Sequence, residues 1–189
     1  PQLISRVKDK SQKIVIVGAG PAGLESARVC AERGHDVLLL EAQSQAGGQV
    51  VLAARASERQ SELLGITQWL TSEIQLLGVE LRLNTVAETE KILSEKPDVV
   101  ITATGGWPEK PLLDGGEDLV VTTSEVLSGE VKIPESVLIF DDHGSERALS
   151  VAEYLQSHGA KDIEIITPDR LIGHDLSATT GPAYLEMLY

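Results

Sequence analysis

The residues that could do chemistry lie between Gly18 and Glu41. Gly18, Gly20 and Gly23 satisfy the pattern G-x-G-x-x-G, and Glu41 ends the second apolar run that follows them. In a dinucleotide site the first glycine allows a tight turn, the second lets a pyrophosphate approach the backbone, and the third lets a helix pack closely on the sheet. The acid would accept hydrogen bonds from both ribose hydroxyls and repel a 2′-phosphate, which disfavours NADP(H).

A strand, a helix and a second strand must hold these residues together. "KIVIVG" (13–18) is a β-branched run that ends in glycine, and "HDVLLLE" (35–41) is a second apolar run. Between them "PAGLESARVCAERG" (21–34) has a proline where a helix would start and a glycine where it would stop. This order predicts a βαβ unit whose helix N-terminus offers free N–H groups to a diphosphate. The alternative is a βαβ unit whose glycines only permit packing and whose acid is solvated.

The rest of the chain continues the alternation of strands and helices. The elements predicted downstream are a glycine-rich loop (42–57), a long amphipathic helix (57–78), a strand (79–83), a short helix (88–96), a strand (97–106), a linker (107–116), a second βαβ unit (136–142, 145–159 and 161–167) and the start of one more helix (175–189). In the long helix the apolar stripe predicts a core face, with Trp69 also buried; the stripe is Leu63, Ile66, Leu70, Ile74 and Leu77.

Composition and charge narrow the class of protein. The chain has 189 residues and a formal net charge of −13, which argues against nucleic acid or an anionic membrane as a partner. Apolar residues make up 42% and aromatic residues 3%, so the core must be aliphatic. One cysteine, Cys30, allows no intrachain disulfide. No apolar run reaches the length of a membrane span and no signal-peptide pattern opens the chain, so we expect a cytoplasmic protein.

The glycine pattern and its surroundings resemble a known family. "VGAGPAGLESARVCAERGHDVLLLEAQSQAGGQ" (17–49) is similar to the FAD- or ADP-binding domain of two-dinucleotide-binding flavoproteins. Within that superfamily, "LAARASERQSELLGITQWL", "LGVELRLNT" and "PDVVITATGGWP" resemble the C-terminal region of Old Yellow Enzyme-like multidomain reductases. That group includes 2,4-dienoyl-CoA reductase, trimethylamine dehydrogenase and the N-methylproline demethylases. The resemblance implies an α/β fold with Rossmann-like parallel sheets, in a fragment of a longer protein.

The resemblance also implies which residues surround a nucleotide. The implied set is Gly18, Gly20, Pro21, Ala22 and Gly23 around the diphosphate, Glu41 and Ala42 at the ribose and adenine, Gly48 and Gln49 near the diphosphate or the riboflavin side, Val86 beside the adenine, and Ala103, Thr104 and Gly105 in the turn that closes over the nucleotide. Arg55 points toward the phosphates or is a solvated loop arginine. We predict no catalytic residue and no metal ligand in this chain.

The second βαβ unit lacks the features of the first. Its turn, "LIFDDHGSERALS", contains one glycine, Gly144, and places Asp141 and Asp142 where a pyrophosphate would dock. At about 4 Å and an effective dielectric constant near 20, each such contact costs about 4 kcal/mol, whereas a helix N-terminus returns at most about 2 kcal/mol. NAD(P)H binding at this turn is therefore doubtful. The competing interpretation is that Asp142 or His143 contacts a ribose in an unusual pose.

These observations lead to a domain plan and two functional hypotheses. We expect a lead-in (1–12), an FAD- or ADP-binding domain (13–110), a second NAD(P)-like domain (111–175) and the start of a return segment (176–189). The first hypothesis is the dinucleotide-binding part of a flavin-dependent oxidoreductase of the amine dehydrogenase, demethylase or enoate reductase type, with an electron-transfer or structural role. The resemblance implies that the parent carries an N-terminal barrel domain with FMN and an iron–sulfur cluster. The alternative is a non-catalytic nucleotide-binding or docking module.

Overall fold

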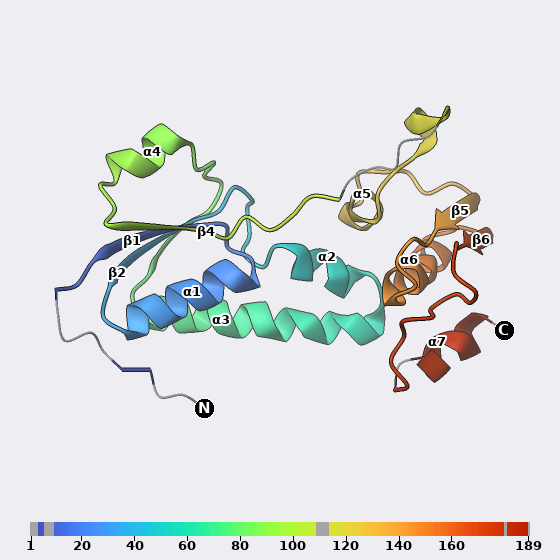
Figure 1. Ribbon diagram of the computed structural model, residues 1–189, viewed down its shortest axis with the longest axis horizontal. Coiled ribbons are helices and arrows are strands. Elements are labelled where there is room, and N and C mark those ends of the chain that lie inside the picture. The colour runs from blue at the N-terminus through green and yellow to red at the C-terminus, as the bar shows by residue number, and fades with distance from the viewer. Residues whose placement is uncertain (1–3, 6–9, 109–113, 180, 189) are drawn as a thin grey trace. The chain divides into compact units, whose positions relative to one another are not determined.

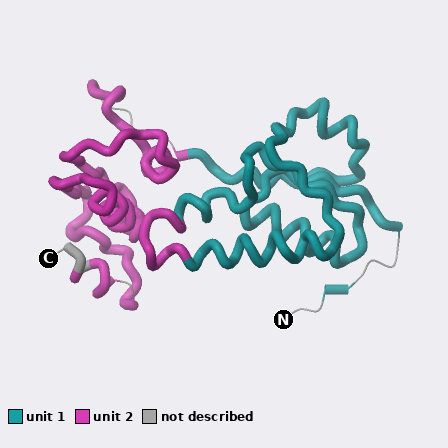
Figure 2. The backbone as a smooth tube through the Cα atoms, turned by 180° about the vertical axis from the view of Figure 1, so that it is seen from behind, with its two compact units in different colours: residues 1–53, 62–107 teal, residues 54–61, 108–189 magenta. Residues whose placement is uncertain are grey.

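The chain folds around two parallel sheets that lie in two separate units (Figures 1 and 2). The computed structural model describes residues 4–5, 10–108, 114–179 and 181–188, so the predicted lead-in and linker fall partly outside the described residues. Unit 1 comprises residues 1–53 and 62–107, and unit 2 comprises residues 54–61 and 108–189. Within the described part of the chain, no helix combines the length and the apolar character that crossing a membrane requires.

Unit 1 is built on a four-stranded parallel sheet with the order β3-β2-β1-β4. Its strands are β1 (Lys13–Val17), β2 (Asp36–Leu40), β3 (Glu80–Arg82) and β4 (Val99–Thr102). The register pairs Val17 with Leu40 on one side and with Thr102 on the other, so three strands end level with one another. Parallel strands end at the same edge of a sheet, and the loops that follow β1, β2 and β4 therefore gather there.

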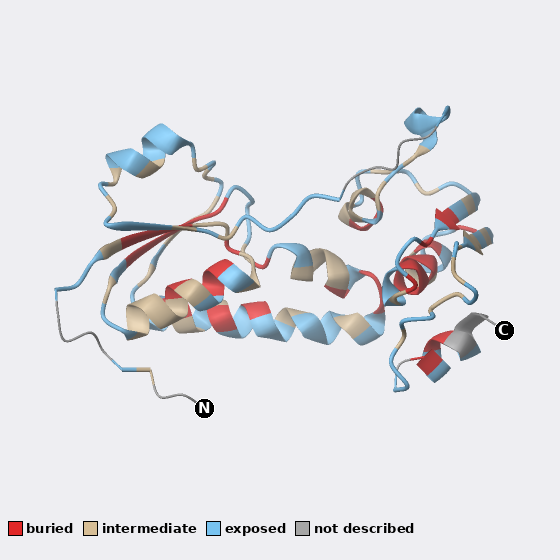
Figure 3. Cartoon of the chain, in the orientation of Figure 1, coloured by how far each residue is buried: buried red, intermediate tan, exposed pale blue. Residues whose placement is uncertain are grey.

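Helices cover both faces of this sheet, as Figures 1 and 3 show. On one face α1 (Pro21–Glu32) and α3 (Leu64–Leu76) pack against the strands, and Leu24 and Ile74 are fully buried between them and the sheet. On the other face Ile92 of α4 (Thr89–Ser94) packs on Leu38 and Leu40. The two central strands, β1 and β2, are aliphatic after their first residue and buried, as expected for parallel strands covered on both faces, whereas β3 and most of β4 are at least partly exposed.

Two predictions for residues 42–78 were wrong in detail. The glycine-rich loop contains a helix, α2 (Gln49–Arg55), and the long helix divides into a 3₁₀ segment, η1 (Glu58–Leu63), followed by α3. The core face of α3 consists of Thr67, Leu70 and Ile74, whereas Trp69 is 53% exposed. The remaining members of the predicted stripe, Leu63, Ile66 and Leu77, are also exposed.

Trp69 lies at the surface with a cation over its ring. The Arg28 guanidinium lies 5.6 Å from the Trp69 ring and is itself held by Glu25 and Glu32. The hydrogen bond to Glu25, and then the charge of Glu32, raise the pKa of Arg28, a side chain that is in any case always charged. A cation–π contact of this kind satisfies one face of an indole without burying the whole side chain. The helical period alone could not distinguish this flank from the true core face.

Unit 2 contains a smaller sheet and the helices around it. Strands β5 (Ser136–Phe140) and β6 (Asp162–Ile166) pair in parallel and are connected by α6 (Glu146–Ser157), which confirms the second βαβ unit. The predicted last helix is α7 (Gly181–Leu188). The sequence analysis missed η2 (Glu117–Leu119) and α5 (Thr123–Ser128). A Thr-x-x-Glu capping box at Thr122 and Glu125 begins α5, and this signal could have predicted it.

Candidate nucleotide site

The glycine turn between β1 and α1 lies at the edge where the strands end. Gly18 has φ +97°, a conformation that side chains other than glycine rarely adopt, and its N–H donates to the Leu40 carbonyl (2.8 Å). Helix α1 then begins at Pro21 with Gly20 as its N-cap, which has no side chain to accept from the first helical amides. The first turn of α1 carries no acidic residue. The positive end of this helix is therefore open to an anion.

The three glycines have different physical reasons to be glycine. A Cβ on Gly18 would overlap the Ala103 carbonyl oxygen, and a Cβ on Gly23 would overlap the Gly18 carbonyl oxygen. The fold itself therefore requires these two residues. Gly20 is different, since its backbone (φ −71°, ψ 179°) suits any residue and a Cβ there would come no closer than 3.9 Å to its nearest neighbour, the Gly48 Cα. Packing does not explain Gly20, whereas a diphosphate lying against the turn would.

Glu41 follows β2 and turns its carboxylate toward the same glycine turn. Its Oε2 accepts a hydrogen bond from the Ala19 N–H at 2.6 Å, and its Oε1 accepts one from the Gln43 N–H at 2.8 Å. The residue is only 8% exposed, so the alternative of a simply solvated acid is wrong. Two backbone donors use about half of the acceptor sites of a carboxylate, and the remaining lone pairs are available to ribose hydroxyls.

A second loop lies against the glycine turn and completes the wall of the site. The Gly47 N–H donates to the Ala19 carbonyl (2.8 Å), which brings Gly48 against Gly20. Gln49, the next residue, reaches across to the turn after β4, where its Nε2 donates to the Gly106 carbonyl at 2.6 Å. Sequence reasoning placed Gln49 near the nucleotide and missed Gly106, because nothing in the local sequence shows which carbonyl the amide meets.

Most of the other predicted residues also lie in unit 1. Pro21 and Ala22 are in the first turn of α1, and Ala42 is exposed directly after Glu41. Val86 is 64% exposed in the loop after β3, which is tied to the loop after β2 by the hydrogen bond from the Thr85 N–H to the Glu41 carbonyl (2.7 Å). The turn after β4 contains the remaining three, Ala103, Thr104 and Gly105. Their contacts with a nucleotide stay predictions.

Arg55 belongs to unit 2, and its hydrogen bonds are with residues of the same unit. Its Nη1 donates to the carbonyls of Leu127 and Ser128, at 3.3 and 3.4 Å. These are the last residues of α5, where free carbonyls and the negative end of the helix dipole favour a cation. This arrangement gives the guanidinium a structural role, and its role at the phosphates stays a prediction.

The turn that begins α6 is arranged differently from the turn that begins α1. Asp141, at the end of β5, is 3% exposed, and its Oδ1 accepts from the N–H groups of His143 (3.2 Å) and Gly144 (3.0 Å). A carboxylate of the chain thus takes the amides that a phosphate would use. A Cβ on Gly144 would overlap the imidazole of His174, so the face of this glycine is filled. The sequence showed the negative charge of Asp141 but not that it folds back on its own turn.

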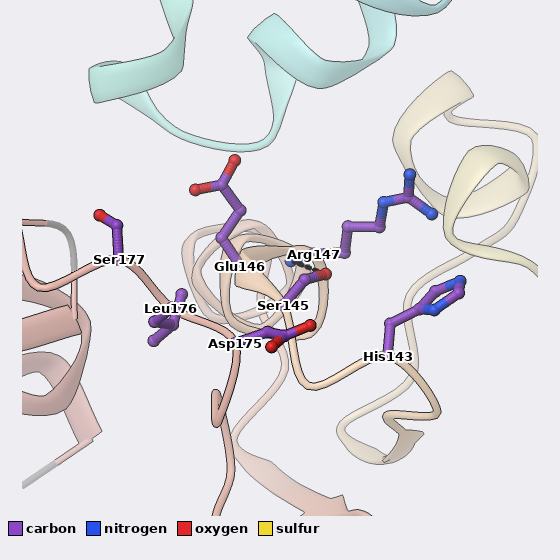
Figure 4. Close-up of a pocket in the computed structure, with 7 residues that line it drawn as sticks. All are labelled: His143, Ser145, Glu146, Arg147, Asp175, Leu176 and Ser177. Atoms are coloured by element: carbon purple, nitrogen blue, oxygen red, sulfur yellow. Dashed lines mark hydrogen bonds between the residues drawn. The ribbon is translucent and has the colours of Figure 1, made fainter.

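A cleft of about 480 Å³ lies at the N-terminus of α6, and Figure 4 shows the residues around it. Two carboxylates, those of Glu146 and Asp175, and one guanidinium, that of Arg147, line it. The complete lining is His143, Ser145, Glu146, Arg147, Asp175, Leu176 and Ser177. The N-cap Ser145 accepts from the Arg147 N–H (3.5 Å), which occupies one of the first helical donors. Both features oppose an incoming diphosphate.

Groups that could do other chemistry are sparse in the described part of the chain. There, no set of three or more His, Cys, Asp or Glu side chains is placed to hold a metal ion. The thiol of Cys30 lies half-buried on α1, and burial raises its pKa, which makes it a poor nucleophile.

Comparisons with known proteins agree with this geometry. Residues 12–139 match the family described as pyridine nucleotide-disulphide oxidoreductase. Over 94% of its length the chain is 48% identical to a probable N-methylproline demethylase of Rhizobium meliloti (strain 1021), and over its whole length 43% identical to the N,N-dimethylglycine/sarcosine dehydrogenase of Chromohalobacter salexigens. It spans about a quarter of these relatives, 26% and 28% of their lengths.

A solved structure of an oxidoreductase also matches nearly the whole chain. The structure of a 2-naphthoyl-CoA reductase in complex with 2-naphthoyl-CoA matches 98% of this chain and 28% of its own, with a TM-score of 0.89 and 31% identity. The predicted resemblance to Old Yellow Enzyme-like multidomain oxidoreductases is therefore confirmed. The chain belongs to the pyridine nucleotide-disulphide oxidoreductase family, as a Rossmann-like dinucleotide-binding domain of the kind that multidomain flavin-dependent oxidoreductases contain.

Proposed function

We propose that unit 1 binds the ADP moiety of FAD, or ADP itself, at the turn between β1 and α1. The observation that carries this proposal is Gly20, whose missing Cβ no contact within the protein explains. The open helix N-terminus offers amides and partial positive charge to the diphosphate. Glu41 has lone pairs left for the ribose hydroxyls and a charge that repels a 2′-phosphate, so the site favours FAD or ADP over NADP(H).

The role of the whole domain is proposed from the activities in the names of its relatives, which are a demethylase, a dehydrogenase and a reductase. We propose that the parent is a flavin-dependent oxidoreductase of the amine dehydrogenase, demethylase or enoate reductase type. A barrel domain with FMN and an iron–sulfur cluster would oxidise or reduce its substrate, in the cytoplasm. FAD, when bound here, would supply electron-transfer chemistry, and ADP would supply only stability. In either case the residues of this chain bind and orient the nucleotide.

We further propose that unit 2 does not use NAD(P)H. The supporting observation is the buried Asp141 carboxylate, which holds the two turn amides that would otherwise meet a phosphate. Glu146 in the first turn of α6 adds a second negative charge at the helix N-terminus. A dinucleotide would have to displace the first carboxylate and tolerate the second.

The substitution Gly20→Ala tests the nucleotide site. The new methyl group has room in the protein and lies where the diphosphate would approach, so ADP affinity should fall at least tenfold in isothermal titration calorimetry. Stability should change by no more than about 1 kcal/mol, because alanine restricts the unfolded chain at a compatible backbone conformation but is a poorer N-cap than glycine.

Gly65→Ala is the matched control for this experiment. Gly65 lies in α3, and a Cβ there would meet nothing within 4 Å. This variant should be as stable as the parent or more so, and it should bind ADP with unchanged affinity. If Gly20→Ala binds ADP as tightly as the unmodified chain does, the site is assigned wrongly.

A further inference from the structure

We infer that the first site selects adenosine ligands by charge, and that it prefers diphosphate diesters such as ADP-ribose and FAD over ADP and ATP. This inference rests on the proposed function, because it concerns the class of ligand that the same glycine turn takes. The observation that carries it is the charge around the turn: the turn offers backbone groups, and the side chain that lies against it is the buried carboxylate of Glu41.

The glycine turn offers an incoming diphosphate only partial positive charge. Helix α1 begins at Pro21 after the N-cap Gly20, and its first residues, Pro21 to Leu24, have no charged side chain. A helix N-terminus is equivalent to about half an elementary charge. This is less than the charge of a diphosphate, so every further negative charge on the ligand must be offset by basic side chains or by salt.

The basic side chains of unit 1, as far as the structure describes them, are paired with acids or belong to other parts of the unit. Lys13, at the opposite end of β1 from the turn, pairs with Glu95 (2.8 Å), and Arg28 pairs with Glu25 and Glu32 (2.7 and 2.8 Å). The others are paired at the end of β3, stand on α4 over a face of the sheet (Figure 1), or lie near the edge where the strands begin; they are Lys10, Arg33, Arg82, Lys91 and Lys96. The phosphate part of the site is thus left to the backbone.

Negative charge dominates around the site instead. Glu41 lies against the turn, with its Oε2 2.6 Å from the Ala19 nitrogen, and the chain has a formal net charge of −13. Arg55 follows the wall of the site in the sequence, but it belongs to unit 2, where it donates to the carbonyls of Leu127 and Ser128. The site therefore opposes each negative charge that a ligand carries beyond those of a diphosphate diester.

Ligands that share the adenosine diphosphate group differ in just this charge. In ADP-ribose and FAD each phosphate carries one negative charge, whereas the terminal phosphate of ADP carries about two near pH 8. One extra unit charge beside a carboxylate in a partly exposed site changes an affinity about three- to tenfold. Salt screens this repulsion, and a proton that binds the terminal phosphate near about pH 6 removes it. The preference should therefore weaken at high salt and at acid pH.

The test compares ADP-ribose, ADP and ATP as ligands of the unmodified chain in the absence of divalent cations. Isothermal titration calorimetry gives the dissociation constants at about pH 8 and about pH 5.5, in about 0.02 M and about 0.3 M sodium chloride. At low salt and about pH 8, ADP-ribose should bind about three- to tenfold more tightly than ADP, and ATP should bind more weakly still. The ratio of the ADP-ribose and ADP affinities should fall toward one at the lower pH and at the higher salt concentration.

Two lysine substitutions locate the effect. Thr104 is exposed, and its Cα lies 3.1 Å from the Cβ position of Gly18. Thr104→Lys places a cation at the glycine turn, so it should raise the affinity for ADP more than that for ADP-ribose and lower their ratio about three- to tenfold. Gln68→Lys adds the same charge at an exposed position on α3 and is the matched control, in which the ratio should not change.

Two results would overturn the inference while leaving the nucleotide site in place. If ADP binds as tightly as ADP-ribose at low salt near pH 8, the site does not select by charge. If ADP-ribose binds more tightly but the ratio does not change with pH, with salt or in Thr104→Lys, contacts with its second ribose make the difference. If the unmodified chain binds none of the three ligands, the proposed function itself fails and this inference fails with it.

Discussion

Replacing Glu41 by glutamine should destabilise unit 1 even when no nucleotide is bound. Each carboxylate oxygen accepts one backbone N–H, from Ala19 at 2.6 Å and from Gln43 at 2.8 Å, in a residue that is 8% exposed. Glutamine keeps one acceptor and puts an NH₂ group in place of the other, so one of the two backbone donors loses its partner. A lost hydrogen bond to a charged group in a buried place costs about 2 kcal/mol.

Urea unfolding followed by tryptophan fluorescence measures this effect in the right unit. Both tryptophans of the chain, Trp69 and Trp107, belong to unit 1; Trp69, which has the Arg28 guanidinium over its ring, is the one whose emission should change on unfolding, because Trp107 is already 89% exposed. With a urea dependence of about 2 kcal/mol per molar, the midpoint should fall by about 1 M. Glu130→Gln, at an exposed position, is the control and should leave the midpoint within about 0.25 M.

The result that would refute this reasoning is a Glu41→Gln midpoint equal to that of the unmodified chain. It would mean that the carboxylate does not bind the glycine turn when the site is empty. The same variant should lose ADP affinity, because the amide offers the ribose one acceptor oxygen in place of two. A stable variant that also keeps ADP affinity would remove Glu41 from the site altogether.

Two further predictions concern stability outside the site. Hydrogen bonds from Lys13 and then Arg82 lower the pKa of Glu95 from 4.5 to about 2, so its contribution is present above pH 4.5 and is lost as the pH falls toward 2. The urea midpoint of the unmodified chain, measured as a function of pH, should fall over this range. The midpoint of Glu95→Gln should fall less, because this variant has no carboxylate at position 95 to protonate. If the two midpoint-against-pH curves run parallel, the ion pairs of Glu95 do not contribute to stability. Thr122→Ala removes the capping box of α5 and should cost about 1 kcal/mol in circular dichroism melts, whereas an unchanged melt would show that the cap carries no weight.

The sequence by itself determined the local geometry of the first βαβ unit. Three glycines, a proline at the helix start and two β-branched or aliphatic runs predicted β1, α1 and β2 within a residue or two. Such signals are local: φ preferences, the missing N–H of proline and the aliphatic character of buried strands act on neighbouring residues. The same reasoning placed Glu41 at the end of β2, beside the glycine turn.

Only the tertiary structure decided which partners these residues meet. Trp69 lies at the surface in contact with Arg28, Arg55 contacts the end of α5, and residues 54–61 belong to unit 2 although the residues before and after them in the chain belong to unit 1. The structure also distinguishes Gly20 from the other two glycines of the pattern. A Cβ on Gly18 would overlap the Ala103 backbone and a Cβ on Gly23 would overlap the Gly18 backbone, whereas a Cβ on Gly20 has room. These outcomes depend on contacts between segments far apart in sequence, and a local pattern carries no information about which distant atom fills a given space.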